Sequence, residues 1–499
     1  MTSTPKKEAV IFTTLIVLVI LFRLPTLNIL LDTDSSANAF LARQMMRGEI
    51  LYDKFHTAHH LPGIYYTFLL AFRLFGDYPI SPKLLLMGFM LAGAWLLYLL
   101  GRDFFDEQTG LLSAFFYVLA TSQLNLAGTT AEMEHFANVP MIATVFLFFT
   151  LHKKNASPLN FIWVGVLGAV AILYKIIFIP SLFAVGFAIL LAAWLERKEK
   201  GTLQKAVLRL GMIGIGVAIP LFLVAGYFAA LGLWERFILL FKLGFQYTAD
   251  QTLIIHFPKP FGFPLFMLAM NNIVLLVVAA LGMYRLIRRS LPAKNTSSQV
   301  DLTLLAWLIA SLFLAGFRGG GYQHYVLIVI PPLVLTTAIE ITTSYQRWKK
   351  AHLVRTAKIG AGTVIVLILL NFLWGNFNLY RYYIPGIPNR ETSFPAIQAQ
   401  QFELFDYIKA HTSPDDFIYV WDINVQPYYY ADRLPPIDIL WASYVSATGA
   451  PERIFDPNTK YIIVADEQFF FRPEWLRDGL AQYYVLETSI HTTELYRRK

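Results

Sequence analysis

The chain has 499 residues, of which 56% are hydrophobic and 15% are charged, and its mean hydropathy is +0.51. A soluble domain cannot bury that much apolar surface, so the composition excludes an ordinary soluble protein and indicates a polytopic membrane protein. Cysteine is absent, which excludes disulfides, thiol nucleophiles and thiolate metal sites.

Long apolar runs predict about eleven membrane spans, because a membrane helix needs roughly 20 apolar residues. The first run covers residues 9–30. The others cover residues 81–100, 111–126, 136–151, 161–174, 176–195, 206–231, 264–283, 302–317, 325–341 and 360–379. The two runs on either side of Lys175 are short, so packing as one interrupted unit stays an alternative.

Basic residues in short loops indicate the orientation, because such loops stay preferentially in the cytoplasm. With the N-terminus inside, Lys and Arg fall in alternate loops; they are Lys6, Lys7, Arg102, Lys153, Lys154, Arg197, Lys198, Lys200, Lys205, Arg285, Arg288, Arg289, Lys294, Arg347, Lys349, Lys350 and Arg355. The net charge of +8 therefore reports topology, and no nucleic-acid partner is expected. The outer face then holds the loops after the first and third spans, residues 232–263 and everything after residue 379.

Two carboxylates, Asp32 and Asp34, directly follow the first span on that outer face. After them, apolar residues at helical spacing predict an amphipathic helix on the membrane surface, which Gly48 ends. Residues 61–75 are apolar, but Pro62 and Gly63 make them a poor full span. They favour a second interfacial or re-entrant helix.

The apolar pattern stops at about residue 379, which predicts a transmembrane domain over residues 1–379 and a soluble α/β domain over residues 380–499. In the second part, residues 398–411 have helical spacing, residues 416–421 and 461–465 are typical of buried strands, and residues 483–487 and 492–498 suit a hairpin. An exported domain without cysteine favours a bacterium or an archaeon. We therefore expect a multi-pass protein of the cytoplasmic membrane whose C-terminal domain is extracytoplasmic.

The order of several motifs resembles the GT-C superfamily of polyprenyl-phosphate-dependent glycosyltransferases, in particular the branch of the protein O-mannosyltransferases and lipid A aminoarabinose transferases. Each motif alone is degenerate, and their order is the specific feature. The motifs are the carboxylate after the first span, Tyr52-Asp53 after Gly48-Glu49, Pro62-Gly63-Ile64-Tyr65-Tyr66, Ala131-Glu132-Met133-Glu134 with Pro140, the segment from Gly168 to Lys175, and the segment from Gly319 to Pro332.

The resemblance implies a GT-C fold and the transfer of a sugar, commonly with inversion, from a lipid phosphate to a hydroxyl acceptor. Such chemistry needs a base for the acceptor proton. Asp34 aligns with the Asp of the family's Asp-Glu pair, although Ser35 replaces the Glu. Asp32 is the alternative base, and a third interpretation is that both carboxylates only cap the helix that begins near Ser35.

The departing lipid phosphate requires fixed cations or dipoles. Lys175 stands between apolar segments, where an ammonium is costly, so it is a candidate phosphate ligand; the alternative is a lysine that reaches to the interface. Arg318 precedes three glycines that would allow close backbone approach, or that simply form a flexible turn. His324 and Tyr325 follow and can donate hydrogen bonds to phosphate or sugar.

Further polar residues in the outer loops are candidates for the sugar, the acceptor or a metal ion. Glu134 matches the family's second-loop acid better than Glu132, because it lies six residues before Pro140. Where relatives commonly have a lysine just before the Pro, this chain reads His59-His60-Leu61-Pro62, and phosphate contact by His60 is a hypothesis despite this departure. With His59, these acids offer ligands for a divalent cation, but the spacing is not diagnostic and no cofactor is assigned.

The expected partners are a polyprenyl-phosphate sugar donor, membrane lipids, and an acceptor that is a glycan, a lipid or a protein. In the C-terminal domain, Trp421-Asp422 and the tyrosines at 428–430 either contact the acceptor or pack a small core. A transporter or flippase of lipid-linked sugars, or a non-catalytic glycolipid-binding relative, stays an alternative. Transporters place ionisable groups near the bilayer midplane and often have repeated halves, whereas these acids lie at outer ends and neither half repeats the other.

Overall fold

The computed structural model describes residues 5–56, 60–195, 197, 201–249, 259–290, 296–317, 322–380, 394–442, 444–445, 451–465 and 471–499. The chain forms two compact units. The helical unit comprises Met1–Leu27, Leu85–Tyr227 and Tyr247–Tyr380. The sheet unit comprises Asn28–Leu84, Phe228–Gln246 and Arg381–Lys499.

Long apolar helices make up the helical unit, as the composition predicts. Its helices are α1 (Pro5–Arg23), α4 (Ser81–Phe104), α5 (Glu107–Thr121), α6 (Met133–Lys153), α7 (Ile162–Ile172), α8 (Pro180–Leu195), α9 (Thr202–Ala230), α11 (Lys259–Ser290), α12 (Thr296–Gly316), α13 (Ile330–Lys350) and α14 (Val354–Tyr380). Within the described residues, nine helices are long and apolar enough to cross a membrane. The other two predicted spans, residues 111–126 and 161–174, coincide with the shorter helices α5 and α7. The prediction of a polytopic α-helical protein is confirmed.

Helix α13 forms the core of the helical unit and packs against α5, α11 and α14. Its apolar window is 94% buried, far more than that of any other span in the described chain. Thr336 and Thr337 lie in this window, and their hydroxyls donate to the carbonyls of Pro332 and Leu333 at 2.7 and 2.9 Å. These bonds satisfy the two hydroxyls inside an apolar bundle, where small residues allow helices to approach closely.

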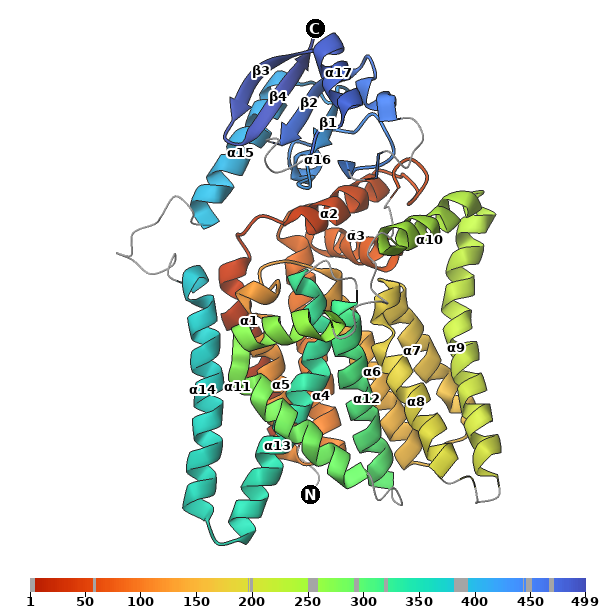
Figure 1. Ribbon diagram of the computed structural model, residues 1–499, viewed down its shortest axis with the longest axis vertical. Coiled ribbons are helices and arrows are strands. Elements are labelled where there is room, and N and C mark those ends of the chain that lie inside the picture. Colours follow the sequence, from red (N-terminus) through yellow and green to blue (C-terminus); the bar gives the residue numbers. More distant parts are fainter. Residues whose placement is uncertain are drawn as a thin grey trace. The chain divides into compact units, whose positions relative to one another are not determined.

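The sheet unit contains one mixed sheet with strand order β1-β2-β4-β3 (Figure 1). β1 pairs with β2 in parallel, and the other pairs are antiparallel. Its strands and helices are β1 (Phe417–Trp421), β2 (Thr459–Ala465), β3 (Tyr484–Ile490), β4 (Thr493–Arg498), α2 (Thr33–Met46), α3 (Gly63–Phe75), α10 (Trp234–Ala249), α15 (Phe394–His411), α16 (Gln426–Tyr430) and α17 (Glu474–Tyr483). The α/β elements predicted after residue 380 are thus confirmed, including the terminal hairpin of β3 and β4.

The boundary predicted at residues 379 and 380 falls where α14 ends, at Tyr380. The compact unit that holds the sheet is larger than residues 380–499, because it also includes Asn28–Leu84 and Phe228–Gln246, which belong to two of the predicted outer loops. The division into a transmembrane and a soluble domain stays a prediction. The loop that carries Asp32 and Asp34 belongs to the same unit as the sheet.

Helix α2 is present where a surface helix is expected, but its character differs. Ser35 to Ala42 are all buried, including the polar Asn38, so α2 has no broad solvent-facing polar side. It packs against α3, beside which it lies in Figure 1, and against α16. Gly48, at a φ of +97°, follows the end of the helix as predicted. The amphipathic prediction was therefore wrong because α2 is covered on more than one side.

Candidate active site

The two carboxylates of the first loop have different local roles. Asp32 is the N-cap of α2, and its Oδ1 accepts a hydrogen bond from the N–H of Ser35 at 3.2 Å. This is the ordinary way to satisfy a free N–H group at a helix start. Asp34 lies in the first turn of α2 and is half-buried. We call residues 32–34 the acidic turn; within it Asp32 has the capping role.

Four of the residues predicted for the site come together in the helical unit. The Nζ of Lys175 donates to the hydroxyl of Tyr325 at 2.9 Å and lies 4.5 Å from the centre of that ring. The rings of His324 and Tyr325 meet edge to face at 4.6 Å. The Nε2 of His324 lies 4.0 Å from Oε1 of Glu134. We call these residues the lysine cluster.

Breaks between helices position the members of the lysine cluster. Lys175 has an extended backbone between the end of α7 and a short 3-10 turn (Ile176–Phe178), after which Pro180 opens α8. His324 and Tyr325 lie in the 3-10 turn Gln323–Val329 that precedes α13. Glu134 is in the first turn of α6. Side chains at helix ends converge here, where backbone N–H groups are also least satisfied.

Both candidate acids of the second predicted outer loop are buried. Glu132 is the N-cap residue of α6, but its side chain makes no capping hydrogen bond. It is 2% exposed, and Glu134 is 0% exposed. A desolvated carboxylate is costly without compensation, and the imidazole of His324 faces Glu134. The structure thus brings Glu134 into the lysine cluster and places Glu132 at the helix cap beside it in sequence.

Among the remaining predicted residues, the structure describes His60. His60 is buried, its carbonyl accepts from the Tyr52 hydroxyl at 3.1 Å, and its ring lies 6.1 Å from that of Trp441. Phosphate contact by His60 stays a prediction. Arg318 and His59 lie outside the described residues. In the described part of the chain, no three His, Asp or Glu side chains gather as a metal site, so the divalent-cation alternative has no ligand set there.

Two residues that sequence reasoning missed hold the lysine cluster in place. Arg23 is 1% exposed and donates to the carbonyls of Gly128 and Thr130, in the loop before Glu132. Asn138 lies one turn after Glu134, and its Nδ2 donates to the carbonyl of Leu327 at 3.1 Å. This bond ties α6 to the turn that carries His324. A sign of Arg23 was available, since a charge inside an apolar run is by default functional or structural.

The aromatic residues of the C-terminal part pack a core. Trp421 meets Trp475 at 5.3 Å, and its Nε1 donates to the carbonyl of Phe471 at 3.0 Å. The hydroxyl of Tyr428 accepts from the N–H of Val420 at 2.9 Å. Burial raises the pKa of Asp422, against the opposing effect of two backbone N–H groups. The packing interpretation of Trp421 and Tyr428 is therefore supported over sugar stacking.

Known proteins share both sequence and fold features with this chain. Residues 59–224 match the family model described as dolichyl-phosphate-mannose-protein mannosyltransferase, whereas no curated protein matches the chain in sequence. ArnT from Cupriavidus metallidurans, bound to undecaprenyl phosphate, has the same fold with a TM-score of 0.66 at 12% identity, over 99% of this chain and 98% of that chain.

A second structural relative is archaeal. The oligosaccharyltransferase AglB from Archaeoglobus fulgidus, in complex with an inhibitory peptide and a dolichol-phosphate, has a TM-score of 0.57 at 12% identity, over 98% of this chain and 74% of that chain. The fold of the chain is the GT-C fold. The chain shares this fold with both glycosyltransferases, and residues 59–224 match the mannosyltransferase family model.

Proposed function

We propose that the protein transfers a sugar from a polyprenyl-phosphate-linked donor to a hydroxyl group on the outer face of a bacterial or archaeal cytoplasmic membrane. The acceptor belongs to a glycolipid, a cell-envelope polysaccharide or a protein. The matched family is named for dolichyl-phosphate-mannose, the ArnT structure holds undecaprenyl phosphate and the AglB structure holds a dolichol-phosphate. All three names contain a polyprenyl-type lipid phosphate, which supports the same donor class here.

The observation that carries this proposal is the environment of Lys175. Its side chain is almost entirely enclosed, at 5% exposure. In the described part of the chain, its hydrogen-bond partner is the hydroxyl of Tyr325, and no carboxylate pairs with it. A buried ammonium without a paired carboxylate is costly, and such groups in membrane proteins mark substrate sites. A lipid phosphate supplies the missing anion.

Within this reaction the cluster residues have distinct roles. Lys175 and the hydroxyl of Tyr325 hold the phosphate and stabilise the charge that grows on it as the sugar leaves. His324 adds a ring N–H, and Glu134 binds sugar hydroxyls or orients His324, which it faces at 4.0 Å. The phosphate departs with the electron pair of its bond to the anomeric carbon.

Asp34 acts as the base. It takes the proton of the acceptor hydroxyl as the acceptor oxygen forms its bond to the anomeric carbon. Attack opposite the departing phosphate inverts that carbon. Asp32 is committed to the N–H of Ser35 through its capping bond, so we assign it the role of shaping the turn.

One observation favours a transporter as the second candidate. Helix α11 is interrupted at Asn272, which has φ −158° and ψ 82°, and discontinuous helices are typical of transporters. The side-chain polar groups of Asn272 have hydrogen-bond partners within the protein, however. The Oδ1 of Asn272 accepts from the N–H of Leu275 at 3.0 Å, and its Nδ2 donates to the carbonyl of Ile368 at 3.2 Å. This break needs no bound ion or substrate, which favours the enzyme.

The direct test incubates purified protein with a panel of undecaprenyl-phosphate and dolichyl-phosphate sugars in the presence of cell-envelope lipids, polysaccharide or protein. Mass spectrometry of the acceptor fraction detects an added sugar. Appearance of a glycosylated acceptor together with free polyprenyl phosphate is the expected result. Intact donors across the whole panel would contradict the proposed donor class.

The proposed orientation gives a separate prediction. Because the basic loops alternate without a break, alkaline phosphatase fused after residue 380 should be active, since that enzyme requires an exported environment, and β-galactosidase at the same point should be inactive. A fusion after Lys154, between α6 and α7, is the matched control and should give the opposite pair of results. An active β-galactosidase after residue 380 would overturn the orientation.

A further inference from the structure

Residues 423–432, which include α16, form hydrogen bonds with Leu31 and with Thr33 of the acidic turn. We call residues 423–432 the clasp. The hydroxyl of Thr33 donates to the carbonyl of Ile423 at 2.7 Å and accepts from the N–H of Val425 at 3.0 Å. The N–H of Leu31 donates to the hydroxyl of Tyr430 at 2.9 Å. The amide of Gln426 donates to the carbonyl of Leu31. Both backbone polar groups of Leu31 and the Thr33 hydroxyl are thus bound by the clasp.

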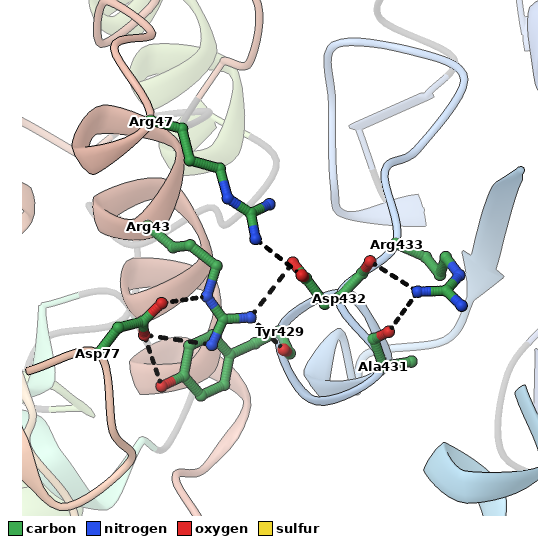
Figure 2. A network of polar contacts seen from close by, with 7 residues as sticks. All are labelled: Arg43, Arg47, Asp77, Tyr429, Ala431, Asp432 and Arg433. Carbon is green, nitrogen blue, oxygen red and sulfur yellow. Dashed lines mark hydrogen bonds and ion pairs between the residues drawn. The ribbon is translucent and has the colours of Figure 1, made fainter. Parts of the chain in front are cut away.

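The clasp also holds the other end of α2 (Figure 2). Arg43 donates to the carbonyl of Tyr429 at 2.6 Å, and its guanidinium lies 4.0 Å above the centre of that ring. The same guanidinium binds both oxygens of Asp77, at 2.6 and 3.1 Å, and the Tyr429 hydroxyl donates to Asp77 at 3.2 Å. Arg47 donates to Asp432 at 2.7 Å.

The ion pairs of Asp432 with Arg43 and Arg47 persist at neutral pH. Burial acts to raise the pKa of Asp432, but the hydrogen bond from Arg47 and the charges of Arg43 and Arg47 together lower it. A lowered pKa means that the ion pairs stabilise the unit above the ordinary pKa of an aspartate, near 3.9, and are lost only as acid protonates Asp432. Burial likewise raises the pKa of Tyr430, so its phenol stays a neutral hydrogen-bonding group.

We propose that the clasp sets the position of the Asp34 carboxylate, with Thr33, Gln426 and Tyr430 as positioning residues for sugar transfer. The proposal rests on the assignment of Asp34 as the base. Asp34 follows Thr33 directly. The Tyr430 hydroxyl, the Gln426 amide and the backbone of residues 423–425 bind Leu31 and Thr33, close before Asp34 in sequence. Because a base displaced by about 1 Å can lose about 10²-fold in rate, this fixation has a direct kinetic consequence.

Through the clasp, the C-terminal part of the chain contributes to the position of the base. Residues 423–432 lie more than 380 residues after the acidic turn in sequence, since the Thr33 to Ile423 bond spans 390 positions. Because these bonds hold Thr33, a displacement of the clasp would displace the turn that carries Asp34.

The test removes the Thr33 hydroxyl with little change in shape. Thr33→Val should lower kcat about tenfold to 10²-fold while leaving the KM for undecaprenyl-phosphate mannose, or whichever panel donor is turned over, within about twofold. Thr33→Ser keeps the hydroxyl and should restore most of kcat. Tyr407→Phe, which removes an exposed hydrogen bond to Glu487 in the same unit, is the matched control and should resemble wild type. Unchanged kcat in Thr33→Val would overturn the proposal.

A second measurement does not depend on activity. The chain has no cysteine, so Asp34→Cys introduces a unique thiol at the position of the base. In that background, adding Thr33→Val or Tyr430→Phe should raise the rate of modification by a membrane-impermeant maleimide several-fold, because the turn is no longer fixed. Equal rates would overturn the clasp. A raised thiol rate in a chain whose Asp34→Asn variant remains active would support the clasp while rejecting Asp34 as the base.

Discussion

Asp34→Asn should lower the rate of sugar transfer by about 10²–10⁴-fold, the usual contribution of a general base. The amide has the shape of the carboxylate but cannot accept the acceptor proton. Asp32→Asn should retain activity within a few-fold, because asparagine caps a helix about as well as aspartate. Initial rates of acceptor glycosylation by the two purified variants, measured with the same donor, check this pair.

The controls separate loss of the base from loss of the fold. Both Asn variants should unfold at the wild-type temperature, whereas Asp32→Ala should lose about 1 kcal/mol through the missing cap. The capping bond to the N–H of Ser35 is the reason for that difference. If Asp32→Asn were the inactive variant and Asp34→Asn the active one, the roles of the two carboxylates would have to be exchanged.

Lys175→Met should reduce kcat/KM for the lipid donor by about 10²–10³-fold, the effect of removing one preorganised charge-stabilising group. Methionine has a similar length and is apolar, so it removes the ammonium that donates to Tyr325 without opening a large cavity. The fold should tolerate it, because replacing a buried charge with an apolar residue relieves desolvation. Kinetics and binding of undecaprenyl phosphate to the purified variant measure the effect.

The matched control for Lys175 is an exposed lysine of the same protein. Lys154→Met removes a cation from the exposed residue that follows α6 and should leave kcat/KM unchanged. Lys175→Arg should retain part of the activity, since a guanidinium still carries the charge but places it differently. If Lys175→Met turned over the donor at the wild-type rate, Lys175 would not be a phosphate ligand, and the alternative of a lysine that reaches to the interface would hold.

The grouping of Glu134, Lys175, His324 and Tyr325 was accessible from the sequence because each lies where an apolar run ends. Charged or polar groups at such ends share the same depth in the bilayer, and the order of motifs placed them in related loops. The distances that join them, such as 2.9 Å between Lys175 and Tyr325, depend on how α6, α8 and α13 pack, and no local pattern encodes that packing.

The attachment of Thr33 to the clasp could not be predicted. The Thr33 hydroxyl binds the carbonyl of Ile423 and the N–H of Val425. Every non-proline residue carries both of these backbone groups. A pattern of side chains cannot show which backbone groups meet. The burial of Asn38 could not be predicted for a related reason. Helical spacing identifies a polar face of α2, but it does not identify the helices that pack against α2, which are α3 and α16.

A sugar transferase breaks the bond between the sugar and the lipid phosphate, and a proteoliposome assay with donor in one leaflet measures this cleavage. Donor, free polyprenyl phosphate and glycosylated acceptor are quantified with time for the wild type and Asp34→Asn. The wild type should produce equal amounts of free polyprenyl phosphate and glycosylated acceptor, and Asp34→Asn should produce about 10²-fold less of both. Donor that crosses to the other leaflet intact, with no free polyprenyl phosphate from either protein, would contradict sugar transfer.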